Sequence, residues 1–557
     1  MARLDRLGPA KELAQIGAAI GREFSHALLA AVARKPVAEL GSSLDRLIRA
    51  GLLFRKGVPP HATYLFKHAL VQDAAYGTLL RQPRRALHAR IADTLESQFA
   101  EIPEGQPEVL ARHYTEAGLI EKAASLWGKA GSRSVGRSAL IEAAEQFTRA
   151  LGQIATLPGT PALRREEIKL QAALLVPLQH IKGIAAPETT AAAERARRLI
   201  EQAEALGEPP EDALLLFLVL GALLLESLVA FNGDLARARA AQILALAEKK
   251  GGKIPLGIGH ASIAGCLLFT GNFAESVLHF NQALALYDPV ELRPLVTRFS
   301  SDPRVMALCY RSIALWALGY PKAALAGTEQ ALSEAREIGH VATLMQAMEG
   351  TSLTQLISCD YAAAQEQTNQ LVALAEEKGS ISWKATGVLR RAGLLALTGK
   401  PSDAVGIFTS VIPAYRSIGT TIYFPMHLSL LARVCGELGR LDDAWGYIGE
   451  AITTVETTNE TWYEAELHRI AGEIALMSPE RDAAKAETYF ERALAVARAQ
   501  QANSWELRAA MSMARLWRDQ GKRDEARNLL APVYGWFTEG FDTLDLKEAK
   551  ALLDELA

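Results

Sequence analysis

The sequence predicts a mainly all-α protein, in which an α-solenoid superhelix follows a small N-terminal domain of helices and short strands. Three observations lead to this prediction. Ala and Leu, the residues that favour helix most strongly, dominate the hydrophobic 49% of the 557 residues. Turn-forming residues recur about every 40 positions through the C-terminal half. Strand-like runs interrupt the helical periodicity between residues 52 and 66.

The charge of the chain is unevenly distributed. Residues 1–90 hold 15 Lys or Arg and 6 Asp or Glu, a net charge of +9, so the remainder carries −12. A basic N-terminal region therefore precedes an acidic body. The four cysteines lie far apart, with no C-x-x-C pair and no secretory leader before them, which predicts a reducing cytoplasm. The most apolar stretch, residues 213–225, is shorter than the roughly 20 residues that span a bilayer and predicts a buried helix.

Residues 1–85 predict a winged-helix-like domain. Helical periodicity covers residues 10–20, 25–34 and 37–50. Strand-like runs at 52–55 and 62–66 flank a turn-rich stretch. Three helices followed by a two-stranded wing is the arrangement of a winged helix.

A winged helix can bind DNA and read its sequence. DNA binding is therefore one function that the sequence leaves open for this domain. The third helix would then present Asp45, Arg46 and Arg49 to bases, and the +9 charge would supply phosphate contacts. The structural alternative is that these side chains are solvated surface charges, since no run of arginines faces one groove. The same choice applies to residues 81–90, where four arginines either bind nucleic acid or cover an apolar helix face with their stems.

A repeat of about 40 residues occupies most of the remaining chain. Its turns fall at Gly271, Gly319, Cys359, Gly399, Gly439, Pro479 and Gly521. Seven residues before each turn stand Ala264, Ser312, Ser352, Ala392, Ala432, Gly472 and Ala514. Five residues after each turn stand Ser276, Ala324, Ala364, Ala404, Ala444, Ala484 and Ala526. All of these are small, as required where two antiparallel helices cross closely, and the pattern predicts tetratricopeptide-type repeats in a variant longer than the usual unit of about 34 residues.

These patterns divide the chain into five segments. They are a winged-helix-like domain (1–85), the first helical repeats (86–160), an irregular helical connector (161–215), tetratricopeptide repeats (216–543) and a C-terminal capping helix (544–557). The capping helix places Leu546, Ala549, Leu552, Leu553 and Leu556 at helical spacing. Stacked hairpins share one core and expose a long concave surface, which suits the binding of a protein partner or a small effector.

The sequence carries no motif for catalysis, and it predicts no cofactor and no metal site. Every Gly-Lys pair is followed by Ala, Ile, Pro or Arg, so the Ser or Thr that a P-loop needs for magnesium is missing. There is no H-E-x-x-H and no G-x-S-x-G. The eight tryptophans fall on predicted repeat helices, where packing explains them better than ligand stacking. The sequence therefore predicts a protein that is not an enzyme.

Four segments carry a resemblance to a known family. They are YLFKHALVQDAAY at 64–76, SDPRV at 301–305, LWALGYP at 315–321 and LAPVYGWF at 530–537. With the order of winged helix and repeats, they make the chain similar to the C-terminal half of bacterial adenylate/guanylate cyclase–ATPase–tetratricopeptide signalling proteins. In such proteins a cyclase domain and a signal-transduction ATPase with numerous domains come before the winged helix. The resemblance leaves three alternatives for Met1, which are a true start, a misassigned start and a break in a longer gene.

The resemblance implies a role for His68. In related ATPases, a histidine at the end of the winged-helix hairpin contacts the β-phosphate of bound ADP, and His68 in Phe66-Lys67-His68 matches that place. A histidine is suited to this contact because its pKa lies near neutrality. The alternative is that His68 only caps the helix that follows.

Two functions of different class remain. The leading hypothesis is a non-catalytic regulatory arm, whose repeats bind a protein or small effector and whose winged helix relays this state to an ATPase or cyclase module in cis or in trans. The alternative is a DNA-binding transcriptional regulator with the repeats as its sensor. Duplex binding that weakens steeply with salt would distinguish the second from the first.

Overall fold

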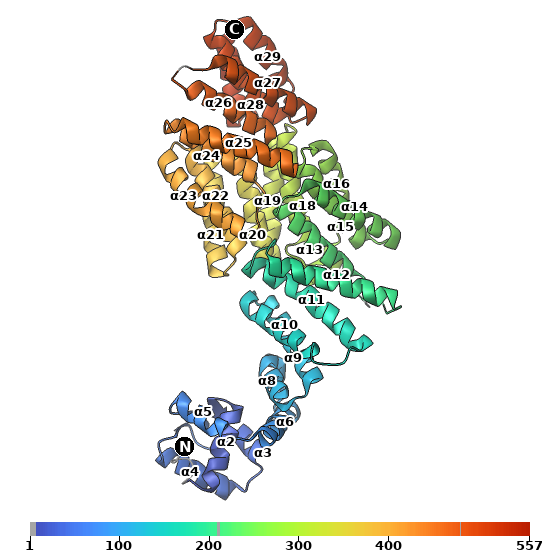
Figure 1. Cartoon of the computed structure of the whole chain (residues 1–557), viewed down its shortest axis with the longest axis vertical. Helices are drawn as coiled ribbons and strands as arrows, with labels where there is room; N and C mark the ends of the chain where they lie inside the picture. Colours follow the sequence, from blue (N-terminus) through green and yellow to red (C-terminus); the bar gives the residue numbers. More distant parts are fainter. Residues whose placement is uncertain (1–6, 209–211, 480) are drawn as a thin grey trace. The chain divides into compact units, whose positions relative to one another are not determined.

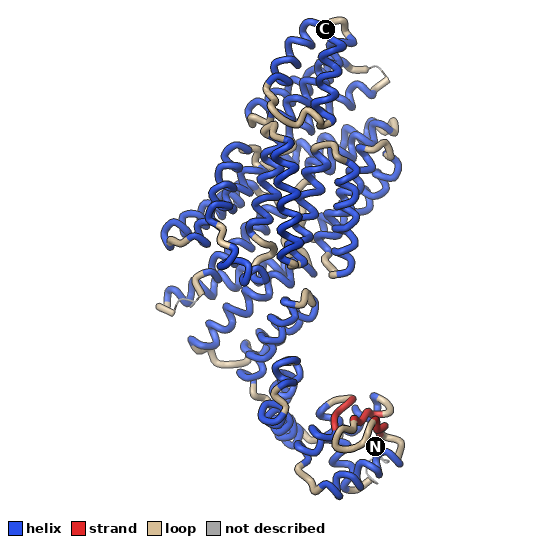
Figure 2. Tube along the Cα trace, turned by 180° about the vertical axis from the view of Figure 1, so that it is seen from behind, coloured by secondary structure: helices blue, strands red, loops and turns tan. Residues whose placement is uncertain are grey.

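The computed structural model describes residues 7–208, 212–479 and 481–557, and these are helical almost throughout (Figures 1 and 2). The chain forms two compact units. The first comprises Met1–Arg137 and Glu142–Leu170, and the second comprises Ser138–Ile141 and Gln171–Ala557. This division falls inside one helix and does not follow the boundaries at residues 85 and 160, which stay predictions.

The first unit begins with three helices and a small sheet. In chain order these elements are α2 (Pro9–Ile20), β1 (Glu23–Ser25), α3 (His26–Ala33), α4 (Val37–Arg49), β2 (Leu53–Lys56), β3 (Thr63–Phe66) and α5 (Ala69–Gly77). The strands form an antiparallel sheet in the order β1-β3-β2. The buried rings of Phe24, Tyr64 and Phe66 hold β1 against β3, with centroids 5.9 and 5.8 Å from that of Phe24.

The sequence predicted two strands, and the structure adds β1 as a third. This strand is only three residues long, too short to produce an alternating pattern. Ser25, predicted as the first residue of a helix, instead ends β1 and caps α3, because its Oγ accepts a hydrogen bond from Leu28 N at 3.1 Å.

Longer helices complete the first unit. They are α6 (Arg81–Gln98), α7 (Glu101–Gly105), α8 (Pro107–Ala117), α9 (Ile120–Gly136), α10 (Leu140–Ile154) and the beginning of α11 (Pro161–Ile181). Helices α8 and α9 form a hairpin that turns at Gly118, whose φ of 78° suits glycine. A further turn falls at Ser138, between α9 and α10, with φ 57° at that residue.

The second unit starts with the helices of the predicted connector. These are the end of α11 and the whole of α12 (Pro187–Ala205), and α13 (Leu214–Val229) follows, mostly within the predicted repeat segment. The segment was expected to be helical but to fall outside the repeat pattern, and its described residues form long helices. The irregularity is confined to their spacing, because the turn at Gly183 does not fit the 40-residue pattern.

Successive helical hairpins then follow to the C-terminus. The first group is α14 (Gly233–Lys250), α15 (Lys253–Phe269), α16 (Phe273–Leu286), α17 (Pro289–Leu292), the 3₁₀ helix η1 (Arg293–Arg298), α18 (Pro303–Ala317), α19 (Pro321–Ile338), α20 (Val341–Ile357) and α21 (Tyr361–Glu377). The second group is α22 (Ile381–Leu397), α23 (Pro401–Ser417), α24 (Phe424–Glu437), α25 (Leu441–Thr458), α26 (Glu464–Met477), α27 (Ala483–Ala499), α28 (Asn503–Asp519), α29 (Arg523–Gly535) and α30 (Leu544–Leu556). The predicted α-solenoid of tetratricopeptide type is confirmed.

Six of the seven predicted turns adopt the left-handed backbone conformation at the predicted residue. The exception is Pro479, where the turn residue is Arg481 with φ 44°. Two extra residues before this turn shift the helix that follows. As a result, Ala486 is buried at the helix crossing and the predicted Ala484 is exposed. Gly472 is still required to be small, since a Cβ there would lie 2.4 Å from the Phe490 ring.

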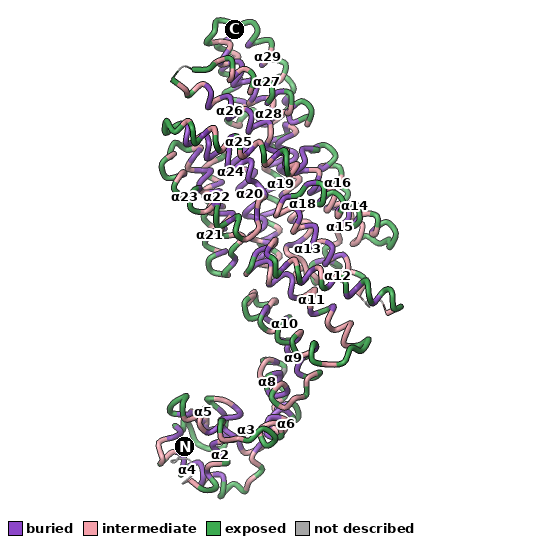
Figure 3. Tube along the Cα trace, viewed as in Figure 1, coloured by how far each residue is buried: buried purple, intermediate pink, exposed green. Residues whose placement is uncertain are grey.

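The two helices of a hairpin differ in burial (Figure 3). The first helix α24 is buried along nearly its whole length, whereas its partner α25 buries only Ala444, Ile448, Ala451 and Val455, one residue per turn. First helices therefore form the inner layer of the solenoid and second helices the outer layer. At the C-terminal end, α30 buries Leu546, Ala549, Leu552 and Leu556 against the last hairpins, with Leu553 half-buried.

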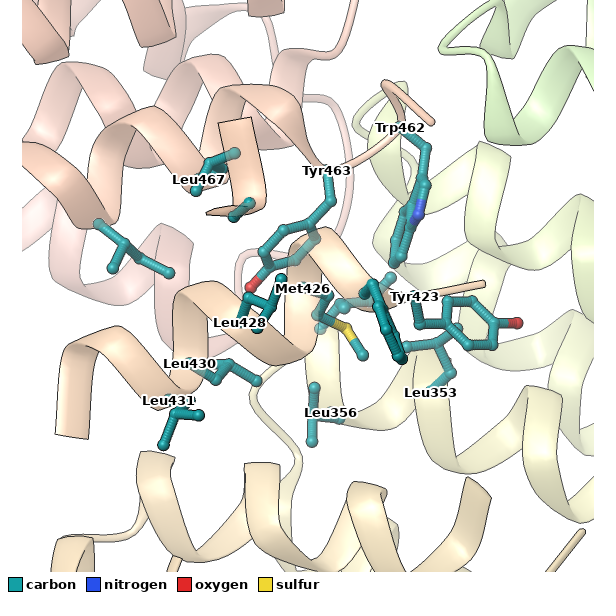
Figure 4. Packing of buried hydrophobic residues seen from close by; sticks show 14 of the residues in the cluster. Leu353, Leu356, Tyr423, Met426, Leu428, Leu430, Leu431, Trp462, Tyr463 and Leu467 are labelled. Atoms are coloured by element: carbon teal, nitrogen blue, oxygen red, sulfur yellow. The ribbon is translucent and has the colours of Figure 1, made fainter. Parts of the chain in front are cut away.

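The solenoid also makes contacts between residues nearly 200 positions apart. The amides of Thr421 and Ile422 donate to Val229 O at 2.8 and 3.0 Å, and those of Thr461 and Trp462 donate to Phe269 O at 3.0 and 3.2 Å. Ser504 repeats this pattern by donating to the carbonyl of Trp316, 188 residues away. Large side chains from α20, α24 and the segment around Trp462 pack in the same core (Figure 4). Within the second unit, successive superhelical turns thus close against each other.

Candidate functional site

The superhelix of the second unit contains a partly open cavity of about 240 Å³, here called the internal cavity. Its wall comes from the inner helices α13, α15, α18, α20 and α22, the C-terminal half of α11 and the loop before α24. The α11, α13 and α15 part of the wall is mostly apolar, and includes Leu175, Val176, Phe217, Leu228 and Phe269, but α11 also contributes Gln179 and His180 and α15 contributes Ser262. Cavities of this kind, apolar with a few polar groups, are typical of small-molecule sites.

Another part of the wall, on α20, α22 and the loop before α24, carries polar groups. Glu349 accepts a hydrogen bond from Arg390 Nη2 at 3.1 Å, and both side chains are at most 3% exposed. The Arg390 guanidinium lies 5.6 Å from the centre of the Tyr423 ring. Burial raises the pKa of Glu349, although Arg390 acts in the opposite direction. Burial also raises the pKa values of Tyr415 and Tyr423, so both hydroxyls remain protonated at neutral pH.

Three polar atoms in the wall have no hydrogen-bond partner within the described residues. They are Gln346 Nε2, Ser382 Oγ and Thr420 Oγ1, and Gln346 and Thr420 are only 6% and 3% exposed. Gln346 also lies close enough to the hydroxyl of Tyr310 to act on its pKa, so Ser382 and Thr420 are the clearer unpartnered groups. The charged groups of the wall are paired, Glu349 with Arg390 and Arg298 with Asp212. A buried polar group without a partner costs free energy, and such a group in a native protein is a candidate ligand contact.

Sequence reasoning named none of these residues. In one sequence, Gln346 and Glu349 are simply polar residues on a repeat helix, and only their place on the inner layer distinguishes them. Trp383, predicted to have a packing role, is half-buried, packs against a hydrophobic cluster and lines the cavity.

A second polar cluster, the Arg508 cluster, consists of Cys359, Glu466, Arg469, Arg508 and Asp545. Arg508 Nη2 donates to Asp545 Oδ2 at 2.8 Å and to the carbonyl of Ile357 at 2.6 Å. Arg469 donates to both carboxylate oxygens of Glu466 at 2.7 and 2.8 Å. Burial by itself raises the pKa of Glu466, but Arg469 outweighs it, and the pKa falls below its usual value. This cluster ties the capping helix α30 to α20, α26 and α28.

His68 lies between β3 and α5 and is exposed. Its carbonyl accepts a hydrogen bond from Val71 N at 3.0 Å, but its side chain makes no capping hydrogen bond. His68 is thus the N-cap residue of α5 through its backbone and not through its side chain. The nucleotide-sensor role stays a prediction.

The candidate DNA-reading residues lie on the exposed face of α4. Asp45 pairs with Arg55 at 3.6 Å, and Arg49 Nε donates to the carbonyl of Asp45 at 3.3 Å. In the basic cluster that follows, the Arg84 guanidinium stacks 4.6 Å from the centre of the Tyr76 ring, and Arg85 Nε donates to Ala117 O at 3.3 Å. These contacts favour a structural role for several of the basic side chains.

Among the described residues, no group of three or more His, Cys, Asp or Glu side chains could hold a metal ion. None of the helices there is long and apolar enough to cross a bilayer.

The solenoid and its internal cavity define the protein class structurally, as an α-solenoid of tetratricopeptide type. No protein-family model matches the chain. An uncharacterized protein of Rhizobium meliloti (strain 1021) is 26% identical over 523 residues, which are 92% of this chain and 49% of that protein. The chain thus spans about half the length of this curated relative.

Solved structures are similar at low identity. A Rap protein complexed with competence and sporulation factor is 14% identical with a TM-score of 0.47, and the match covers 70% of this chain and 100% of that one. A signal-transduction ATPase with numerous domains and a tetratricopeptide sensor, from Pyrococcus horikoshii, is 12% identical with a TM-score of 0.32, over 76% and 64% of the two chains. Yeast Tom70 is 12% identical with a TM-score of 0.32, over 84% and 96%.

Proposed function

We propose that the chain is a non-catalytic regulatory arm of a cytoplasmic signalling ATPase or nucleotide cyclase, and that its solenoid binds a protein partner or small effector. The observation that carries this proposal is the internal cavity, whose wall holds three buried polar atoms without partners. A rigid spacer has no use for a cavity with unsatisfied polar groups, whereas a binding protein does.

The position of the cavity suits regulation. Its wall is drawn from residues between Ala172 and Tyr423, so an occupant would contact helices of several successive hairpins at once. Helix α11 contributes its C-terminal half to the wall, while its N-terminal half, up to Leu170, belongs to the first unit. Binding alters such a system only if the ligand has different affinities for two arrangements of these helices.

The first unit is the proposed relay. Its order of helices and strands, with β2 and β3 as the wing, supports a winged helix. The exposed His68, at the end of that hairpin, would donate to the β-phosphate of ADP held by the ATPase module. The chain itself supplies no phosphate-binding loop.

The test measures ADP release from a signal-transduction ATPase core that carries its own P-loop, with and without the full chain added. The chain should slow the release of a fluorescent ADP analogue at least about fivefold, the lower range of allosteric coupling. The His68→Ala variant should lose this effect, and His61→Ala, another exposed histidine of the hairpin, should keep it. An unchanged release rate, or turnover of ATP by the purified chain alone, contradicts the proposal.

DNA binding through α4 is the alternative function. It predicts duplex binding that falls by orders of magnitude between about 50 and 200 mM salt, and a loss of sequence preference for Arg46→Ala. Fluorescence anisotropy with a labelled duplex distinguishes the two functions.

A further inference from the structure

The internal cavity has an uneven distribution of polar groups, which restricts the chemistry of its occupant. The residues from α13 are all apolar, and those from α11 and α15 are apolar except for Gln179, His180 and Ser262. Another part of the wall holds Gln346, Ser382 and Thr420, whose side-chain polar atoms lack partners. An occupant that matches both parts has an apolar body and at least one hydrogen-bonding group.

The charges around the cavity indicate that this occupant is neutral. Glu349 is paired with Arg390, and Arg298 is paired with Asp212. Arg390 Nε and Nη1 have no partner, but Arg390 does not line the cavity. A charged ligand would therefore lose its hydration without gaining an unpaired counter-charge in the wall, and the cost of burying such a charge is large.

We infer that the internal cavity binds a neutral, largely apolar small molecule that carries a hydroxyl or carbonyl group. Its apolar part contacts α11, α13 and α15, and its polar group accepts a hydrogen bond from Gln346 Nε2. Ser382 and Thr420 can each donate or accept a further bond. This inference rests on the proposed function, because it names the ligand class of that regulatory site.

Glycine positions in the wall allow the cavity to be filled by substitution. Gly221 on α13 lines the cavity, and a Cβ there would meet no atom within 4 Å. Gly265 on α15 also lines it, and its Cβ would lie 3.9 Å from Leu228, an ordinary contact. Because both glycines are helical, Gly221→Leu and Gly265→Leu also improve helix propensity. Gly446 on the exposed side of α25 offers the matched control Gly446→Leu.

The experiment uses the full chain and N-phenyl-1-naphthylamine, an uncharged probe that fluoresces in apolar surroundings. The wild type should bind the probe saturably at one site. Gly221→Leu and Gly265→Leu should bind it at least about tenfold more weakly, because the inserted side chain occupies the same space. Gly446→Leu should bind it unchanged, and thermal unfolding followed by circular dichroism shows whether each variant is folded.

Head-group selectivity is measured by displacing this probe with octan-1-ol, octanoate or octylammonium, which share a chain and differ in charge. Octan-1-ol should displace it at a concentration at least about tenfold lower than either ion does. Gln346→Leu should weaken the binding of octan-1-ol about fivefold, because the hydrogen bond from the amide is lost. Three results would each overturn the inference. The first is displacement of the probe by an ion at an equal or lower concentration than octan-1-ol. The second is unchanged probe binding in folded Gly221→Leu and Gly265→Leu, and the third is the absence of saturable probe binding.

The probe assay does not use the ATPase, so the two proposals can fail separately. A chain that binds the probe in the cavity but leaves ADP release unchanged overturns the proposed function alone. A chain that slows ADP release but binds no probe overturns the ligand inference alone.

Discussion

The internal cavity and the Arg508 cluster both contain polar side chains inside the same solenoid. They differ in how completely the hydrogen bonds of these side chains are made. In the Arg508 cluster, Arg508 and Arg469 are each held by carboxylates at hydrogen-bond distance. In the cavity wall the charges are paired, but Gln346, Ser382 and Thr420 leave neutral polar atoms without partners.

This difference separates a structural site from a candidate binding site. A buried charge that loses its partner is very costly, so a fully paired cluster such as that of Arg508 stabilises the tertiary structure it joins. A neutral polar atom without a partner lowers the stability by less, and it is tolerated where a ligand supplies the missing hydrogen bond. Three measurements test this comparison, in decreasing order of expected effect.

The largest effect is expected from Arg508→Met. This variant leaves Asp545 and Glu466, 19% and 6% exposed, without the cation that lies between them. The free energy of unfolding should fall by about 3–5 kcal/mol, as for a broken buried ion pair. Urea denaturation measures this change.

The control for that measurement is Arg515→Met, because the pair of Arg515 with Glu548 joins the same two helices but is 40% and 47% exposed. The free energy of unfolding of this variant should fall by no more than about 1 kcal/mol. Equal losses for the two variants would mean that the Arg508 cluster is no more structural than a surface pair.

A buried carboxyl without a cation gives the intermediate effect. Glu460 accepts hydrogen bonds from Tyr423 N at 2.8 Å and Trp462 Nε1 at 3.0 Å, while its Oε2 has no partner. Burial raises its pKa to about 8. The folded protein therefore holds this proton more tightly than the unfolded chain, and the resulting stability is lost as the pH rises from the ordinary value of 4.5 through about 8.

Glu460→Gln removes this dependence because the amide cannot ionise. The difference in unfolding free energy between the variant and the wild type should grow in favour of the variant between pH 5 and pH 8, with a slope of up to about 1.4 kcal/mol per pH unit. Urea denaturation at intermediate pH values measures the slope. Parallel curves for the two proteins would show that Glu460 is ionised or solvated throughout.

The smallest effect is expected in the cavity wall. Gln346→Leu removes an amide whose Nε2 has no partner, so the free energy of unfolding should change by less than about 1 kcal/mol, in either direction. Thr420→Val should behave in the same way. A loss close to that of Arg508→Met would make Gln346 a structural residue and would remove the distinction between the two sites.

The regular part of the fold was readable from the sequence because its signals are local. The turn glycines and the small residues at helix crossings act within one hairpin, and Ala392, Ala404, Ala432 and Ala444 are all fully buried where the pattern placed them. The pattern was wrong at Pro479, where two inserted residues moved the turn to Arg481. It also missed β1, which is too short to show a period.

The candidate site was not readable in this way. Its wall combines residues from α11 to α24, and Gln346 differs from a surface glutamine only in its surroundings. The resemblance to a known family pointed to His68 as a candidate site residue. In the structure His68 is exposed and lies at the end of a hairpin.

The sequence by itself determined the helical hairpins, their spacing of about 40 residues and the small residues at their crossings, because helix formation and neighbour packing depend on residues close along the chain. Only the tertiary structure decided that Val229 meets Thr421 and that Phe269 meets Thr461. The small rotation between neighbouring hairpins accumulates over many repeats, and no local pattern fixes the total. The internal cavity is a product of that accumulated rotation.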